Sequence, residues 1–230
     1  MLFQYLIKQH ILNVYVLTLI CVLLCIVIPY LLGSLNFGVI LSRKLYREDV
    51  RGKGSGNAGA TNMLRSYGKA AGALTLLGDA LKTAVAVGFG LLLYGAYGAY
   101  LAGLYCILGH MFPLYYRFKG GKGIVCLAIT VLMTDWRVFL ILFAIFLIIV
   151  IGTKYVSLGS VMGALLYPVV LNRINTITSN AVRSVELIAV VIAAFVVFMH
   201  RENIKRLMRG EESKLSFKKK KPANGAGEDQ

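Results

Sequence analysis

Charged side chains are scarce in this chain. Asp, Glu, Lys and Arg make up 15% of its 230 residues, against 58% hydrophobic residues, and the mean hydropathy is +0.72. Soluble domains average about 25% charged residues, and a water-soluble core cannot bury this much apolar surface. The composition therefore predicts an all-α integral membrane protein, and it leaves no soluble domain that would bind nucleic acid.

Acidic residues are the scarcest charges, with 10 Asp and Glu against 25 Lys and Arg and a net charge of +15. The basic residues lie between the apolar runs and near the carboxyl terminus. They indicate membrane orientation and anionic partners, such as membrane phospholipids or phosphorylated substrates.

The four cysteines have neither metal-binding nor disulfide spacing. Each lies in an apolar stretch without a neighbouring histidine, at Cys21, Cys25, Cys106 and Cys126. We predict that they are small buried hydrophobic residues, so neither zinc nor a disulfide is expected. A nucleotide cofactor is not expected either, because the chain lacks the GxxxxGK[ST] phosphate loop and a strand-rich fold around it.

Seven apolar segments are separated by polar or glycine-rich breaks. They cover residues 12–41, 71–93, 96–116, 124–134, 137–152, 156–171 and 185–199. A crossing of about 30 Å takes roughly 20 helical residues, so the first segment is tilted or broken and the fourth is too short to cross unaided. A re-entrant half-helix is the alternative for the fourth. The first is too long for a cleavable signal peptide, and we expect it to remain as a transmembrane helix.

The distribution of Lys and Arg orients these segments. Of the 25, 20 fall in the tail and in loops on one side of a seven-helix topology, 4 fall on the other side, and Lys82 lies inside a segment. By the positive-inside rule, the amino terminus is outside and the carboxyl terminus is cytoplasmic. We expect one polytopic membrane domain over 1–210 and a basic, disordered cytoplasmic tail over 211–230.

The string FKGGKG at 118–123 is followed at once by an apolar helix. Glycines let a backbone approach an anion closely, successive N–H groups at a helix start form a positive concavity, and Lys122 adds a full charge. The pattern predicts a phosphate site. The structural alternative is a tight turn from which Lys119 and Lys122 reach lipid headgroups.

A second glycine-rich string, RGKGSGNAGATN, covers residues 51–62. Its small residues also suit close helix packing. However, its hydroxyl and amide side chains stand beside Arg51 and Arg65, which is costly near hydrocarbon unless a polar ligand or water is present. We therefore favour a ligand site. The predicted topology places on the same face of the membrane the strings TKYVSLGS at 153–160 and HRENIKRL at 200–207.

Two opposite charges lie inside an apolar segment. Asp79 and Lys82 are spaced i, i+3 on a helix, and we predict that they neutralise one another rather than contact a ligand. Trp136, beside Asp135 at a predicted outer boundary, is interpreted as an interfacial anchor. His10, near the outer start of the first segment, is interpreted as structural.

Five longer strings combine glycine, basic and polar residues. They are GSLNFG at 33–38, GSGNAGATNMLRSYG at 54–68, GHMFPLYYRFKGGKG at 109–123, KYVSL at 154–158 and HRENIKRLMRGEE at 200–212. In order and spacing they resemble the acyl-phosphate-dependent glycerol-3-phosphate acyltransferases of bacterial membranes, from about residue 31 to 214. The resemblance implies a seven-helix inner-membrane enzyme whose active site faces the cytoplasm. Its reaction would move a fatty acyl group from acyl phosphate to the sn-1 hydroxyl of glycerol 3-phosphate, giving lysophosphatidic acid and phosphate in the first step of phospholipid synthesis.

The resemblance also implies roles for individual residues. It places catalytic positions at Ser55, Arg65, Lys122, Ser157, His200 and Asn203. It places substrate-binding or phosphate-binding positions at Gly54, Gly56, Asn57, Thr61, Asn62, His110, Gly120, Gly121 and Gly123. The chain departs from the family at Asn36, where proline is frequent, and at Thr83, where a glycine commonly follows the lysine. Both departures bear on local helix geometry.

The chemistry constrains the mechanism. Acyl phosphate is a mixed anhydride with an activated carbonyl, so no covalent enzyme intermediate is required. The protein has to bring two anions together and stabilise the leaving phosphate, which basic residues and N–H groups can do. The HxxxxD pair of many glycerol-lipid acyltransferases is absent, because neither His110 nor His200 is followed by Asp five positions on. We predict direct transfer assisted by the donor's phosphate, with Ser55 or Ser157 orienting substrate.

Two alternative functions stay open on the sequence alone. Transporters also use glycine-broken helices with basic residues at depth, so a small transporter of phosphorylated metabolites is one alternative. No internal repeat supports it. A noncatalytic lipid-binding subunit is the other.

Overall fold

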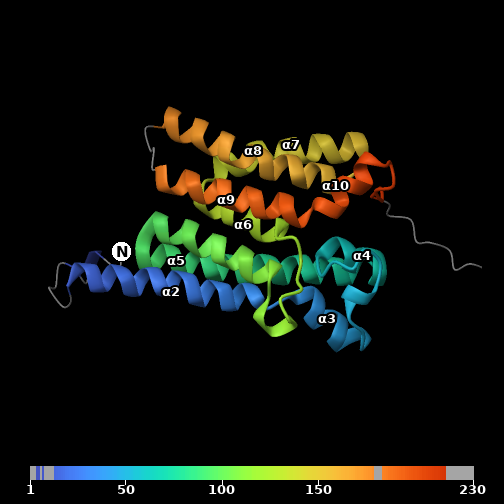
Figure 1. The fold of residues 1–230 in the computed structure, drawn as a ribbon, viewed down its shortest axis with the longest axis horizontal. Coiled ribbons are helices and arrows are strands. Elements are labelled where there is room, and N and C mark those ends of the chain that lie inside the picture. Colours follow the sequence, from blue (N-terminus) through green and yellow to red (C-terminus); the bar gives the residue numbers. More distant parts are fainter. Residues whose placement is uncertain (1–3, 6, 8–12, 179–182, 216–230) are drawn as a thin grey trace, which may run out of the picture.

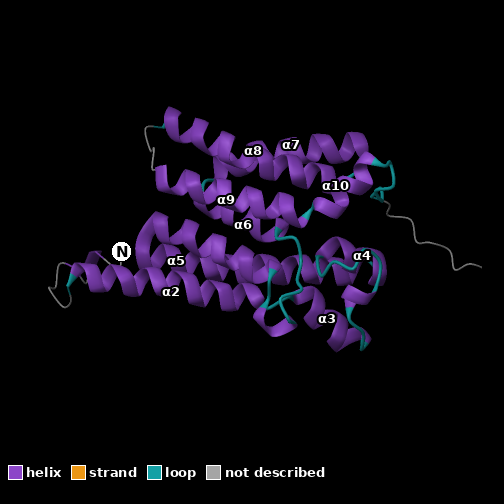
Figure 2. Ribbon diagram, in the orientation of Figure 1, coloured by secondary structure: helices purple, strands orange, loops and turns teal. Residues whose placement is uncertain are grey.

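The computed structural model describes residues 4–5, 7, 13–178 and 183–215. Every regular element that these residues form is a helix, which confirms the predicted all-α class (Figure 2). Four helical stretches are long and apolar enough to cross a membrane, and a bent pair of helices makes a fifth. Residues 8–12, including His10, and the lysine-rich residues 216–230 lie outside the described part.

The first predicted segment is broken in two. Helix α2 (Val14–Ser34) ends at Leu35, and α3 (Phe37–Tyr46) begins after Asn36. The Asn36 side chain accepts a hydrogen bond from the Val39 N–H at 3.4 Å, as helix N-cap residues do. Asn36, at a position where the family often has proline, therefore starts a new helix by capping it.

The long helix α5 (Lys69–Met111) is two helices joined by a tight reversal. Tyr94 and Gly95 have non-helical backbone angles, and Gly95 has a φ of +69°. A Cβ atom on Gly90 would lie 2.2 Å from the carbonyl oxygen of Gly98, eight residues away, so the two halves double back against each other (Figure 1). This reversal confirms the predicted break between 71–93 and 96–116. The second half ends earlier than predicted, at Met111, because Pro113 follows.

The remaining predicted segments also form helices. These are α6 (Ile124–Thr134), α7 (Trp136–Thr153), α8 (Val156–Ile177) and α9 (Arg183–Met199). The bounds of α6 match the prediction, whereas α8 runs six residues beyond the predicted 171. The apolar run ends there, but the helix continues through Asn172, Arg173 and Thr176, which are exposed. Hydropathy marks where a helix leaves an apolar environment and not where its hydrogen bonds stop.

The helices pack around a shared core. Its largest cluster joins α5, α6, α7, α8 and α9 through buried side chains that include Ile107, Val138, Tyr167 and Ile192. Helix α2 packs against the second half of α5, where a Cβ on Gly33 would lie 2.1 Å from the Cys106 carbonyl oxygen. All four cysteines are buried and free, as predicted.

The polar motifs gather at one end of the bundle. Helices α3, α4 (Ala60–Tyr67) and α10 (Arg201–Met208) lie at this end, on the right in Figure 1, whereas α2 begins at the other end. Helix α10 is bent by 58° from the end of α9. Two short 3-10 helices, η1 (Val50–Gly52) and η2 (Leu114–Tyr116), lie in the loops around this end. Four motifs distant in sequence are thus brought together.

Candidate active site

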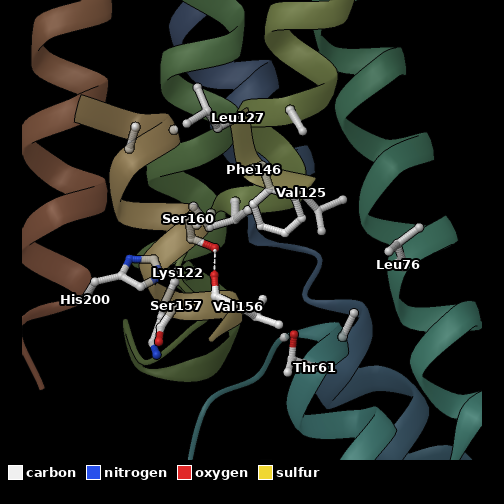
Figure 3. A pocket seen from close by; sticks show the side chains of 18 of the residues that line it. Thr61, Leu76, Lys122, Val125, Leu127, Phe146, Val156, Ser157, Ser160 and His200 are labelled. Atoms are coloured by element: carbon white, nitrogen blue, oxygen red, sulfur yellow. Dashed lines mark hydrogen bonds between the residues drawn. The ribbon is translucent and has the colours of Figure 1, made fainter. Parts of the chain in front are cut away.

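A pocket of about 410 Å³ lies where these motifs meet. Polar side chains form one end of it, and in Figure 3 Lys122, Ser157 and His200 lie together there, with Leu127, Val125 and Phe146 beyond them. The polar residues that line the pocket are Ser55, Asn57, Thr61, Asn62, Arg65, Asp79, His110, Lys122, Ser157, Ser160, His200, Asn203 and Glu212. All six residues predicted as catalytic are among them.

The nine residues predicted to bind substrate or phosphate divide into two groups. Five line the pocket, namely Asn57, Thr61, Asn62, His110 and Gly123. The other four do not line it and shape the two loops, namely Gly54, Gly56, Gly120 and Gly121.

Asn62 organises the first glycine-rich loop. Its amide nitrogen lies 3.1 Å from the Val50 carbonyl oxygen and 2.9 Å from those of Lys53 and Asn57, and its amide oxygen accepts from the Ser55 N–H at 2.9 Å. Asn62 is 1% exposed. Because both ends of this amide are bonded to the loop, Asn62 positions Ser55 and Asn57 along the pocket.

The second glycine-rich loop closes onto the end of α5. The N–H groups of Gly120 and Gly121 donate to the carbonyl oxygens of Met111 and His110, at 3.2 and 3.0 Å. Both N–H groups are thus used within the protein, which differs from the predicted concavity of free N–H groups at these two glycines. A Cβ on Gly121 would lie 2.1 Å from the His110 Nε2, so only a glycine fits there. The turn presents Lys122 to the pocket.

Lys122 begins a chain of polar contacts. Its Nζ donates to the Oδ1 of Asn203, whose Nδ2 donates to the Oε1 of Glu212 at 2.7 Å, and the Nε of Arg206 donates to the Oε2 of Glu212 at 2.8 Å. Burial lowers the pKa of Lys122 to about 8, and the charges of Arg206 and Arg65 add to this effect. Burial raises the pKa of Glu212, but the hydrogen bonds from Arg206 and Asn203 outweigh it and keep the pKa below its ordinary value.

The prediction missed Glu212, which was placed at the start of a disordered tail. Residues 211–215 instead continue the site. Glu212 is 8% exposed, the Ser213 carbonyl accepts from the Arg65 guanidinium at 3.1 Å, and the Leu215 N–H donates to the Lys154 carbonyl at 2.7 Å. The signal in the sequence was that Glu212 ends the string HRENIKRLMRGEE, which belongs to the family resemblance.

Ser157 and His200 complete the polar end. The Ser157 Oγ is buried, and its hydroxyl lies near enough to the Glu212 carboxylate to help lower the pKa of that group. The His200 Nδ1 lies 2.8 Å from the Val196 carbonyl oxygen. Because a carbonyl only accepts, Nδ1 carries the hydrogen, which leaves Nε2 as an acceptor.

The predicted Asp79–Lys82 pair is confirmed, at 2.7 Å, with both side chains buried. The Lys82 Nζ also donates to the carbonyl oxygens of Gly33 and Leu35, at 3.0 and 2.7 Å, and lies 3.0 Å from the His110 Nδ1. The buried pair therefore ties the break between α2 and α3 to the end of α5. Through His110, which packs on Gly121, it also supports the second loop.

This arrangement suits one class of ligand. Arg65 and Lys122 supply positive charge at the polar end, and most of the remaining lining of the pocket is apolar. A ligand with an anionic head and an alkyl chain matches both parts. Among the described residues no three His, Cys, Asp or Glu side chains lie close enough to hold a metal ion.

Comparison with known proteins gives the family. A family model described as glycerol-3-phosphate acyltransferase matches residues 23–210. Glycerol-3-phosphate acyltransferases of Finegoldia magna and Thermoanaerobacter pseudethanolicus are each 40% identical over 192 residues, which cover 82% and 84% of this chain and 93% and 94% of the relatives.

Solved structures agree with this result. The crystal structure of PlsY (YgiH), an integral membrane glycerol 3-phosphate acyltransferase, in its glycerol 3-phosphate form has a TM-score of 0.77 and 34% identity to this chain. The match covers 85% of this chain and 96% of that one, and the lysophosphatidic acid form has a TM-score of 0.74. The chain therefore belongs to the glycerol-3-phosphate acyltransferase family.

Proposed function

We propose that the protein transfers a fatty acyl group from acyl phosphate to the sn-1 hydroxyl of glycerol 3-phosphate, releasing lysophosphatidic acid and phosphate. Acyl transfer to glycerol 3-phosphate in phospholipid synthesis is the activity of the family to which the chain belongs. One observation carries the proposal furthest: a single pocket of about 410 Å³ joins a polar end that holds Arg65 and Lys122 to an apolar part between α6, α7 and α8.

In the proposed reaction, Lys122 and Arg65 hold the phosphorylated groups and offset their mutual repulsion. Two phosphates carry about four negative charges, which a poorly hydrated site accepts only when they are paired. The Asn203–Glu212 contacts hold Lys122 in place. Ser55, Asn57 and Thr61 offer further hydrogen bonds to substrate oxygens, and the His200 Nε2 accepts one from a substrate hydroxyl. These polar groups are fixed before substrate arrives, so little reorganisation is needed during the reaction.

The transfer is a single displacement. The sn-1 oxygen forms a bond to the acyl carbonyl carbon, the bond from that carbon to the phosphate oxygen breaks, and the hydroxyl proton passes to an oxygen of the departing phosphate. Lys122 stabilises the charge on that phosphate. Ser157, whose side chain lines the polar end of the pocket, orients substrate and is not acylated. Trapping of an acyl-serine on the turnover pathway would overturn this scheme.

The enzyme lies in the bacterial inner membrane with seven crossings, its amino terminus outside and its active site facing the cytoplasm. Two observations support this orientation. The reversal in α5 supports the proposed number of crossings, because it divides one apolar stretch into two helices; the 11-residue helix α6 is the proposed further crossing, and it is too short to cross unaided. The pocket's polar end lies at the end of the bundle that gathers the basic loops, as the positive-inside rule requires of a cytoplasmic face.

The test is phosphate release by purified protein in detergent or vesicles. We expect release from acyl phosphate only when glycerol 3-phosphate is present, with equal amounts of lysophosphatidic acid formed. Acyl-CoA and acyl-carrier protein serve as alternative donors and should give no product. Turnover with either of them, or none with acyl phosphate, would contradict the proposed donor. Movement of glycerol 3-phosphate across sealed vesicles without acylation would favour the transporter alternative.

A further inference from the structure

The apolar part of the pocket runs between three helices. It begins beside Lys122 and Ser157 and is walled by residues of α6, α7 and α8. From Ile124 to Val131 along α6 is seven residues, or about 10 Å of helix. Its far wall consists of Val131, Phe139 and Leu142. An alkyl chain whose head lies at Lys122 therefore extends along α6 and α8 toward these side chains.

Two glycines of α8, Gly159 and Gly163, line this part of the pocket and differ in the space around them. They are four residues apart and so lie on one face of the helix. A Cβ on Gly159 would lie 2.9 Å from ring and methyl carbons of Phe146 and Val150, so Gly159 allows α7 and α8 to pack closely. A Cβ on Gly163 would meet no heavy atom within 4 Å. The absence of a side chain at Gly163 is thus not required by packing, and it leaves open space in the pocket wall.

We propose that Gly163 determines specificity for the acyl chain, because its missing side chain leaves room for the distal methylenes of long donors. This inference rests on the proposed function, since it concerns the chain carried by the acyl donor. Gly163 is six residues, or about 9 Å of helix, from Ser157 at the polar end. A side chain added there shortens the apolar part without touching the groups that hold phosphate.

The experiment measures kcat/KM for acyl phosphates of graded length with the purified enzyme and with Gly163→Ala, Gly163→Val and Gly163→Leu. Excluding a methylene from an apolar pocket costs about tenfold or more in kcat/KM. We expect Gly163→Leu to lower the ratio of long-donor to short-donor kcat/KM by at least about tenfold, with Val intermediate and Ala smallest. Gly163→Ala adds one methyl group to open space and should fold normally, so it still tests the inference if Gly163→Leu folds poorly.

Gly152→Leu is the matched control. Gly152 is also a helical glycine, in α7, with no heavy atom within 4 Å of an added Cβ, but it is exposed and does not line the pocket. Its chain-length profile should equal that of the unaltered enzyme. Equal losses for all donor lengths in the Gly163 variants, or an unchanged profile, would overturn the inference. If the unaltered enzyme used no acyl phosphate of any length, the proposed donor would fail and this inference with it.

Discussion

The two glycine-rich loops look alike in sequence but are held in different ways. The loop around residues 50–59 is bound mainly through side chains: the amide of Asn62 contacts three carbonyl oxygens and one N–H, and the Ser42 Oγ accepts from the Val50 N–H. The loop over 112–123 is bound by its own backbone to the end of α5, through Gly120 and Gly121. Arg51 joins the two loops by donating to the carbonyl oxygens of Tyr116 and Lys119, at 3.0 and 2.8 Å.

The two loops therefore differ in which of their groups stay available to bind an anion. In the second loop the N–H groups of Gly120 and Gly121 are occupied, so Lys122, and not these two N–H groups, contributes to binding an anion. In the first loop, Asn62 is occupied, so the free groups are those it positions, Ser55 and Asn57. Glycine-rich strings near basic residues therefore do not act alike merely because their composition is alike.

The largest expected effect removes the charge from the second loop. Lys122→Met should lower kcat/KM by on the order of 10³, because a preorganised charge at the developing phosphate is lost from a poorly hydrated site. Phosphate release from acyl phosphate and glycerol 3-phosphate measures it. Lys119→Met is the control, since that side chain is exposed and outside the pocket. Near-normal turnover by Lys122→Met would mean that the loop is only structural.

A methyl group tests how the second loop is closed. Gly121→Ala should lower kcat/KM by about 10²-fold, because its Cβ collides with the His110 ring and a displacement of about 1 Å at a site has such an effect. Gly52→Ala in the first loop is the control, as an added Cβ there meets nothing within 4 Å. If both variants behaved alike, the contrast between the loops would be wrong.

Removing the amide of Asn62 tests the first loop. Asn62→Ala leaves buried carbonyl groups without donors, so the free energy of unfolding should fall by about 2 kcal/mol, and kcat/KM by roughly thirtyfold if the same contacts position substrate. Thermal unfolding in detergent and the acyl-transfer assay measure the two effects. Asn172→Ala, at an exposed position of α8, should change neither. A stable but inactive Asn62→Ala protein would instead indicate direct substrate contact.

The smallest effect is the pH dependence of the unaltered enzyme. The pKa of Lys122 is lowered to about 8, so this side chain loses its positive charge as pH rises through that value. Substrate phosphates, with a second pKa near 6, are already dianionic there. We expect kcat/KM to fall about tenfold between pH 7 and pH 9. A flat profile up to pH 10 would show that Lys122 stays charged in the free enzyme.

The helices were predictable from sequence because apolar runs and their breaks are local signals. The reversal at Gly95 and the start of α6 after Gly123 follow directly from the pattern. The meeting of the four motifs also followed, since the positive-inside rule places basic loops on one side. The Asp79–Lys82 pair was predictable from its i, i+3 spacing.

The contacts between motifs were not predictable. Glu212 reaches Asn203 and Arg206 because the chain turns back onto α10 at Gly210, whose φ is +71°, and no periodicity in the sequence encodes that contact. The use of the Gly120 and Gly121 N–H groups depends on where α5 ends in space. Similarly, the sequence does not distinguish Gly159 from Gly163, and only the atoms around each glycine in the folded structure do so.

The contacts of residues 211–215 have a consequence for biosynthesis. The Glu212 carboxylate accepts a hydrogen bond from Asn203, and the Leu215 N–H donates to the Lys154 carbonyl oxygen in the turn before α8. During translation these residues are made after all of the described helices. A chain that ended at Arg209 would have every described helix but would lack the carboxylate that contacts Asn203 and, through Asn203, Lys122.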